Sequence, residues 1–192
     1  MFSWVNFLTY VTVTSATPGP NNILSMNNGG QLGLKKSYRF NLGIFVGFFI
    51  VAFGTTMLSH ALHAALPVIK KPMLILGALY LLYLAWTIFR SSEIEKKATK
   101  TKFISGLLLQ FINPQSYLYS LASMEAFVLP YYQGNIPAIT GFVLILTTIV
   151  VLFTLAWAMF GQLFHALFTR YRKITNTVLA LLLVYCAISL FF

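Results

Sequence analysis

The sequence contains no aspartate and only three acidic residues, Glu93, Glu95 and Glu125. Charged residues of both signs make up 8% of the 192 positions, whereas a typical soluble domain carries about a quarter. This scarcity excludes a soluble globular protein. The net charge of +10 would fit a nucleic-acid-binding protein, but the basic residues stand in short clusters between long apolar runs, as in membrane proteins. No nucleic-acid partner is therefore predicted.

Cysteine is almost missing, and a cleavable leader is not apparent. Cys186, the one cysteine, lies inside an apolar run, so neither a disulfide framework nor a cysteine-based metal site is expected. No basic stretch follows Met1, and we predict that the first apolar segment is retained as a helix. His60 and His63 lack a third ligand for a metal and are interpreted as interface histidines. No cofactor is expected.

Apolar residues are abundant, at 58% of the chain. A helix needs about 20 of them to cross the hydrocarbon core of a bilayer. We therefore predict an all-α integral membrane protein with the lipid bilayer as a partner. Its six predicted transmembrane helices are Phe2–Asn27, Asn41–Leu66, Pro72–Phe89, Phe103–Leu129, Ala138–Phe164 and Ile174–Phe191.

Basic residues mark one side of the membrane. The loops after the first, third and fifth predicted helices hold Lys35, Lys36, Arg39, Arg90, Lys96, Lys97, Lys100, Lys102, Arg170, Arg172 and Lys173. The other side has only Lys70 and Lys71. By the positive-inside rule the first side is cytoplasmic, and both termini are predicted to be periplasmic in a bacterial inner membrane.

Three helices in each half give the halves opposite directions. We predict a single transmembrane transporter domain over 1–192, in which repeat 1 covers about 1–90 and repeat 2 covers about 103–192. A basic cytoplasmic linker at about 90–102 joins them. The first helix of each half is interrupted by proline. Broken helices at matching positions of inverted repeats indicate the binding site of a transporter.

The two interruptions supply the candidate substrate-binding residues. They are Thr17, Pro18, Gly19, Pro20, Asn21 and Asn22 in the first helix, and Asn113, Pro114 and Gln115 in the fourth. Proline favours the first position of a helix and Thr or Asn favours the cap, so we predict new half-helices after Thr17 and after Asn113.

A half-helix that begins inside a membrane presents unpaired N–H groups to a carboxylate, and the carbonyls that end the preceding half attract an ammonium. A small zwitterionic amino acid matches these two poles. The alternative is that both prolines are simple kinks, which are common in membrane helices.

Three further residues are weaker candidates. Gly43 and Gly47 are predicted hinge or packing positions in a glycine-rich second helix that also offers a contact face for a homodimer. Glu125 near the outer end of the fourth helix is a candidate for proton coupling, and the alternative is that it reaches the outer surface.

These motifs resemble a known family. The run from Thr17 to Asn22, the glycines of the second helix and Asn113-Pro114 after an apolar run are similar to the lysine exporter superfamily, in its homoserine/threonine-exporter branch. The resemblance covers essentially the whole chain. It implies six helices and the efflux of an amino acid.

Some segments resemble exporters of cysteine and O-acetylserine within that branch, namely Gln110-Phe111, Phe127–Pro130 and Val178–Ala187. Many relatives have an acidic residue where this chain has Phe48, and lysine where it has Gln115. Both differences imply a neutral pocket, which suits a neutral zwitterion better than lysine.

Two functions from other classes compete with transport. An intramembrane enzyme would need a metal or nucleophile motif, and no His-Glu-x-x-His, aspartate pair or Gly-x-Ser-x-Gly is present. An assembly subunit would explain the hydrophobicity, but not two matched polar breaks. We therefore interpret the chain as a transporter, and the resemblance implies that it exports cysteine and O-acetylserine, with homoserine, threonine or another neutral amino acid as the alternative.

Overall fold

The described part of the chain is built from helices, which confirms the all-helical prediction for these residues. The computed structural model describes residues 2–90, 103–164, 166 and 170–191, without the side chains of 60–70. Its elements are α1 Trp4–Ala16, α2 Pro20–Leu32, α3 Leu34–Met57, α4 Ser59–Arg90, α5 Phe103–Ile112, α6 Pro114–Ser123, the π-helix η1 Met124–Val128, α7 Leu129–Tyr132, α8 Ile136–Leu163 and α10 Arg172–Ser189.

Within the described ranges, four helical stretches are long and apolar enough to cross a membrane, namely Leu34–Met57, Lys71–Arg90, Ile136–Leu163 and Arg172–Ser189. The first and fourth predicted helices are absent from this set because each is divided into shorter pieces. Large apolar side chains such as Leu79, Tyr83 and Leu181 are about 60% exposed on the outside. An exterior of this kind suits lipid, not water.

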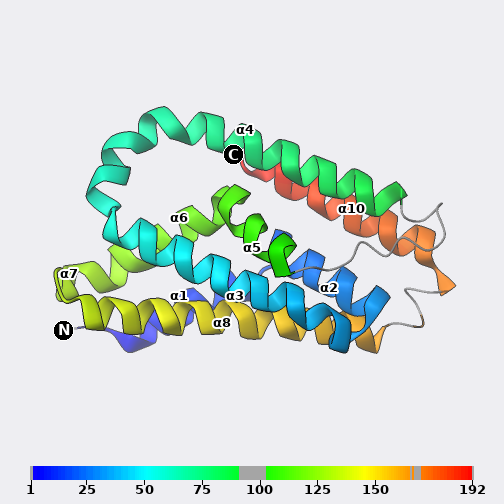
Figure 1. Cartoon of the computed structure of the whole chain (residues 1–192), viewed down its shortest axis with the longest axis horizontal. Coiled ribbons are helices and arrows are strands. Elements are labelled where there is room, and N and C mark those ends of the chain that lie inside the picture. The colour runs from blue at the N-terminus through cyan, green and yellow to red at the C-terminus, as the bar shows by residue number, and fades with distance from the viewer. Residues whose placement is uncertain (1, 91–102, 165, 167–169, 192) are drawn as a thin grey trace.

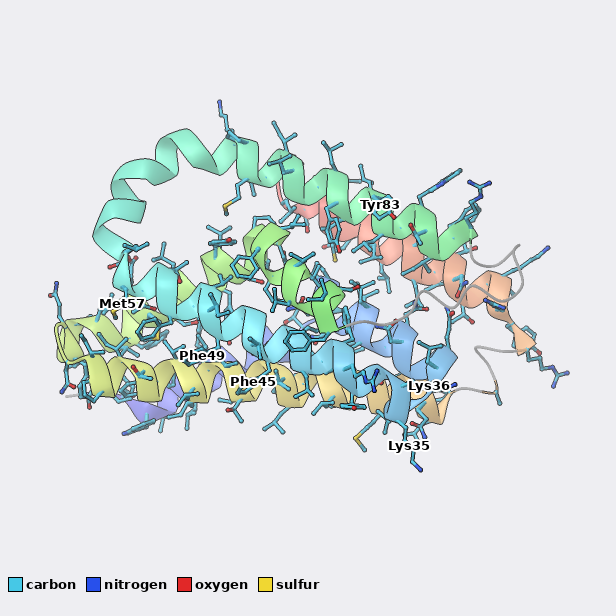
Figure 2. The ribbon with its side chains drawn as sticks, viewed as in Figure 1. Lys35, Lys36, Phe45, Phe49, Met57 and Tyr83 are labelled. Atoms are coloured by element: carbon cyan, nitrogen blue, oxygen red, sulfur yellow. The ribbon has the colours of Figure 1, made fainter. Side chains whose placement is uncertain are left out.

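The helices form two layers, with α5 and α6 between them and α1 beside α8. Figure 1 shows α3 beside α8 along one edge and the antiparallel pair α4 and α10 along the other. Figure 2 places Lys35 and Lys36 at one end of α3 and Met57 at the opposite end. We call the first the basic end, where α4 also finishes and α10 begins, and the second the N-terminal end, which holds α7 and the start of α1.

Two predicted loops are wrong. Lys35, Lys36 and Arg39 lie inside α3 because Gly33, with a φ of 75°, reverses the chain at a single residue and lets α3 begin at once. The predicted loop that carries Lys70 and Lys71 is helical as well.

The second and third predicted helices meet at Leu58 instead of near Leu66. A run of good helix formers after Ser59 carries α4 on as one 32-residue helix. Its interior prolines, Pro67 and Pro72, each remove a backbone hydrogen bond, and α4 follows an arc in Figure 1. The basic linker at 91–102 lies outside the described residues.

Glycines let two pairs of helices touch backbone to backbone near the basic end. A Cβ atom on Gly29 of α2 would collide with the carbonyl of Ala158 in α8, and one on Gly161 would collide with that of Met26. Such contact requires residues without side chains.

The same arrangement joins α3 to α5. Cβ atoms on Gly43 and Gly106 would collide with the carbonyls of Phe103 and Phe40, and one on Gly47 would lie 2.7 Å from that of Leu107. Gly43 and Gly47 therefore face α5 within the chain. These two glycines therefore serve packing within the chain, and the homodimer stays a prediction.

Gly106→Ala is expected to lower the free energy of unfolding by about 1–3 kcal/mol, because the new methyl group forces α3 and α5 apart. Thermal melting of the purified protein in detergent measures this. Gly54→Ala is the matched control, since a Cβ atom there meets nothing within 4 Å. Equal melting temperatures for the two variants would contradict the close crossing.

Candidate functional site

The first break spans Thr17 to Gly19, which are extended between α1 and α2. The prediction that Thr17 caps a helix starting at Pro18 is wrong. The Thr17 hydroxyl donates to the carbonyl of Val13 at 2.9 Å and so finishes α1. Pro20 holds the first position of α2, and Gly19 precedes it as an N-cap without a side-chain hydrogen bond. A second proline disfavours helical geometry at the residue before it, which delays α2 by two residues.

The second break is one residue wide and matches its prediction. Asn113 is the N-cap of α6, and its side-chain oxygen accepts a hydrogen bond from the backbone N–H of Gln115 at 3.1 Å. Pro114 occupies the first helical position, where its missing N–H costs nothing. The predicted cap at Asn113 is thus confirmed.

Asn22 holds the first break closed. Its side-chain amide donates to the carbonyls of Ser15 and Thr17, both at 2.8 Å. The indole N–H of Trp157 donates to the carbonyl of Ala16 at 3.3 Å. The carbonyls that end α1 were expected to be available to an ammonium, but protein groups already pair with three of them. Such pairing is required where no water is present to bind a backbone carbonyl.

A cavity of about 50 Å³ lies where the two breaks meet. It is lined by Thr14, Ser15, Thr17, Gly19, Asn21, Asn22, Phe48, Asn113, Gln115, Ser116, Tyr119 and Val150. This is room for about four water molecules, the scale of a small solute. None of these lining side chains is charged. Phe48 and Gln115, the positions where many relatives are expected to carry charge, both face it.

The breaks are in direct contact across this cavity. A Cβ atom on Gly19 would lie 3.0 Å from the side-chain oxygen of Gln115. Six of the predicted residues therefore line one space: Thr17, Gly19, Asn21, Asn22, Asn113 and Gln115. Pro18, Pro20 and Pro114 shape the breaks but do not line this cavity.

Sequence reasoning missed a buried amide pair beside the cavity. Gln110 of α5 is completely buried and exchanges two hydrogen bonds of 3.0 Å with the side chain of Asn21. Its oxygen also accepts from the hydroxyl of Ser116 at 2.9 Å. The signal in the sequence is a glutamine within an apolar run, three residues before Asn113.

A second missed link joins α1 to α6. The hydroxyls of Ser15 and Tyr119 lie 2.9 Å apart, and that of Tyr119 also donates to the carbonyl of Val11 at 3.1 Å. The signal is the polar stripe of α6, in which Ser116, Tyr119 and Ser123 recur at helical spacing.

A larger vestibule of about 620 Å³ adjoins the cavity. The two share Thr14, Thr17, Gly19, Gln115 and Tyr119. The vestibule is further lined by Tyr10, Pro18, Pro20, Leu74, Leu118, Ala122, Tyr185, Cys186, Ser189 and Leu190. Most of these residues come from the parts of α1, α6 and α10 that run toward the N-terminal end, while Pro18 and Pro20 belong to the first break and Leu74 belongs to α4. The cavity therefore communicates with that side of the protein.

The amino-acid sequence of the chain matches a known family. The family model described as LysE type translocator matches residues 12–192. The chain belongs to the LysE-type translocator family. The cysteine/O-acetylserine efflux proteins of Escherichia coli strain K12 and Shigella sonnei strain Ss046 are each 36% identical to it over 188 residues, which is 97% of this chain and 96% of theirs. No solved structure matches the chain.

The remaining candidate residues of this LysE-type translocator lie away from the cavity. Glu125 is a partly buried residue of η1 and lines neither the cavity nor the vestibule. Gly43 and Gly47 pack on α5. The side chains of His60 and His63 lie outside the described residues. Among the residues that are described, no three His, Cys, Asp or Glu side chains cluster as a metal site would require.

Asn22→Leu is expected to lower the free energy of unfolding of this translocator by about 1–3 kcal/mol, because it leaves the carbonyls of Ser15 and Thr17 without their partner. Chemical or thermal unfolding in detergent measures the loss. Asn6→Leu, at an exposed position of α1, is the matched control and should change little. A loss no larger than that of the control would show that Asn22 does not hold the break.

Proposed function

We propose that this translocator exports small neutral amino acids, with cysteine and O-acetylserine as the leading substrates. The observation that carries the proposal is the uncharged polar cavity at the meeting point of two helix breaks. The names of the relatives, cysteine/O-acetylserine efflux proteins, support the same substrates. Homoserine or threonine is the alternative within the same class.

The start of α2 suits the carboxylate of such a substrate. Gly19 caps this helix without a side-chain hydrogen bond, so the first N–H groups of α2, at Asn21 and Asn22, have no carbonyl of their own helix to bind. All three residues line the cavity. At α6, by contrast, the side chain of Asn113 already accepts one such N–H group. The carboxylate therefore sits at the first break.

The ammonium group is assigned to the other side of the first break, at the end of α1. The C-terminal end of the α1 dipole lies there, together with the hydroxyls of Thr14 and Thr17 and the side-chain oxygen of Gln115. These acceptors are neutral, so they suit one positive charge that a carboxylate balances within the same molecule. A second positive charge, as in lysine, would find no acidic partner in the lining and would be costly to bury.

We further propose six membrane spans arranged as two inverted repeats in a single domain. The α1–α2 and α5–α7 segments form the two divided spans. Gly77 of α4 lies against Pro114, and the thiol of Cys186 in α10 is 4.0 Å from the carbonyl of Pro18. The third helix of each half thus covers the break of the other half, which is the exchange that an inverted pair implies.

The basic end is assigned to the cytoplasm by the positive-inside rule, with both termini in the periplasm of a bacterial inner membrane. The vestibule would then open to the outside. Glu125 is retained as a proton-coupling residue only in an indirect role through η1, since it does not reach the cavity. An intramembrane enzyme is disfavoured, because the cavity presents amides and hydroxyls without an acidic residue, histidine or cysteine in its lining.

Flux through purified protein in liposomes tests the function. Liposomes are loaded with cysteine, O-acetylserine, threonine or lysine, and the rate at which each amino acid leaves is measured with and without a pH gradient. Cysteine and O-acetylserine should move much faster than lysine, and a dependence on the gradient would reveal proton coupling. Lysine flux equal to that of cysteine would contradict the neutral-zwitterion site, and absence of flux for the whole panel would remove the proposed function.

Gln115→Lys tests the requirement for a neutral lining. A lysine in this position places a charge inside the cavity, and flux of neutral amino acids should fall roughly tenfold or more. Gln133→Lys makes the same change at an exposed position after α7 and should leave flux unchanged. Similar flux from both variants would show that Gln115 does not face the substrate.

A further inference from the structure

One face of α2 carries a polar stripe from the cavity toward the basic end. Asn21, Ser25 and Asn28 are spaced four and three residues apart, so they lie one above another on this face. A membrane-buried half-helix has little reason to place amides and a hydroxyl in a row unless they meet polar partners or a polar solute.

Partners from α5 and α3 pair with the first two residues of this stripe, Asn21 and Ser25. Asn21 exchanges two hydrogen bonds with Gln110, and the hydroxyl of Ser25 donates to the side-chain oxygen of Asn41 at 2.9 Å. The amide of Asn41 donates in turn to the carbonyl of Ser37 at 3.1 Å. Ser25 and Gln110 are completely buried and Asn41 is 1% exposed. We call this contact, formed by Asn21, Ser25, Asn41 and Gln110, the polar seam.

The helices on either side of the seam are held to their own neighbours in a different way. Gly29 and Gly161 bring α2 into backbone contact with α8, and Gly43 and Gly106 do the same for α3 and α5. These crossings offer no side chain that can swing aside and no polar group for a solute. The pairs α2–α8 and α3–α5 are therefore two closely packed pairs of helices, which also pack extensively against each other along α3 and α8.

The seam is the contact between these pairs that a polar solute can replace. Hydrogen bonds between membrane helices contribute only about 1 kcal/mol each, and water or a zwitterion can take over the same donors and acceptors. At the other side of the cavity the vestibule already leads toward the N-terminal end. The vestibule thus lies on one side of the cavity and the seam lies on the other.

We propose that the polar seam is the cytoplasmic half of the translocation path, closed in this structure, and that it opens when the α2–α8 pair tilts away from the α3–α5 pair. The stripe on α2 then leads a small zwitterion from the basic end to the cavity. This inference rests on the proposed export function for its direction, but the opening itself can be measured without any transported substrate.

Thiol labelling tests the opening. With Cys186→Ser the chain has no native thiol, and Ser25→Cys then reports the seam. Thr154→Cys is the control, because Thr154 is equally buried and shares a face of α8 with Ala158 and Gly161, which contact α2. Inside-out vesicles expose the basic end to a small, charged, membrane-impermeant thiosulfonate.

Ser25→Cys should be labelled at least tenfold faster than Thr154→Cys, although both side chains are inaccessible in this structure. Equal rates, or no labelling of Ser25→Cys, would overturn the proposal. If Ser25→Cys does not insert, Asn41→Cys reports the opposite wall of the same seam. Selective labelling of Ser25→Cys without amino-acid flux would support the opening of the seam and contradict the proposed export function. Flux without labelling would support the export function and contradict the opening of the seam.

Discussion

A helix that is interrupted inside the hydrocarbon region must find a partner for every backbone group that the interruption releases. In this chain the partners come from the protein itself. Asn22 and Trp157 take up the carbonyls at the end of α1, and the side chain of Asn113 takes up an N–H group at the start of α6. Because such partners exist only inside the bundle, both breaks turn inward, and the cavity forms where they meet. The thiol of Cys186 in α10 adds a weak contact to the carbonyl of Pro18, and Gly77 of α4 lets that helix pack against Pro114.

The way in which the helices are joined near the basic end follows from a second constraint. In lipid, no hydrophobic effect holds one helix against another. Helices must then be joined by close packing or by hydrogen bonds, and this chain separates the two. Glycines give tight contacts within α2–α8 and within α3–α5, while α2 meets α3 and α5 through polar side chains and α8 packs on α3. Tight contacts keep their geometry, and polar contacts can exchange partners. The polar contacts are for this reason the place at which we propose that the protein opens to a polar solute.

Local chemistry made a large part of the site predictable from the sequence. Proline and a preceding asparagine determine the second break and its cap. Both breaks could be predicted because proline removes a backbone hydrogen bond wherever it stands inside a helix. Prediction failed where two signals competed, as at Thr17, where the second proline moved the start of α2 to Pro20. It also failed where one residue replaced a loop, at Gly33 and Leu58. The pair of Asn21 and Gln110 joins residues 89 positions apart, and no local pattern encodes such a partner.

The most direct test of the account is to locate the bound substrate. An experimental structure of the protein with reduced L-selenocysteine would place the selenium by its anomalous scattering. The account predicts one selenium in the cavity lined by Asn22, Asn113 and Tyr119, with the carboxylate against the turn from Gly19 to Asn22. Selenium bound elsewhere in the bundle, with this cavity empty at a saturating concentration, would contradict it.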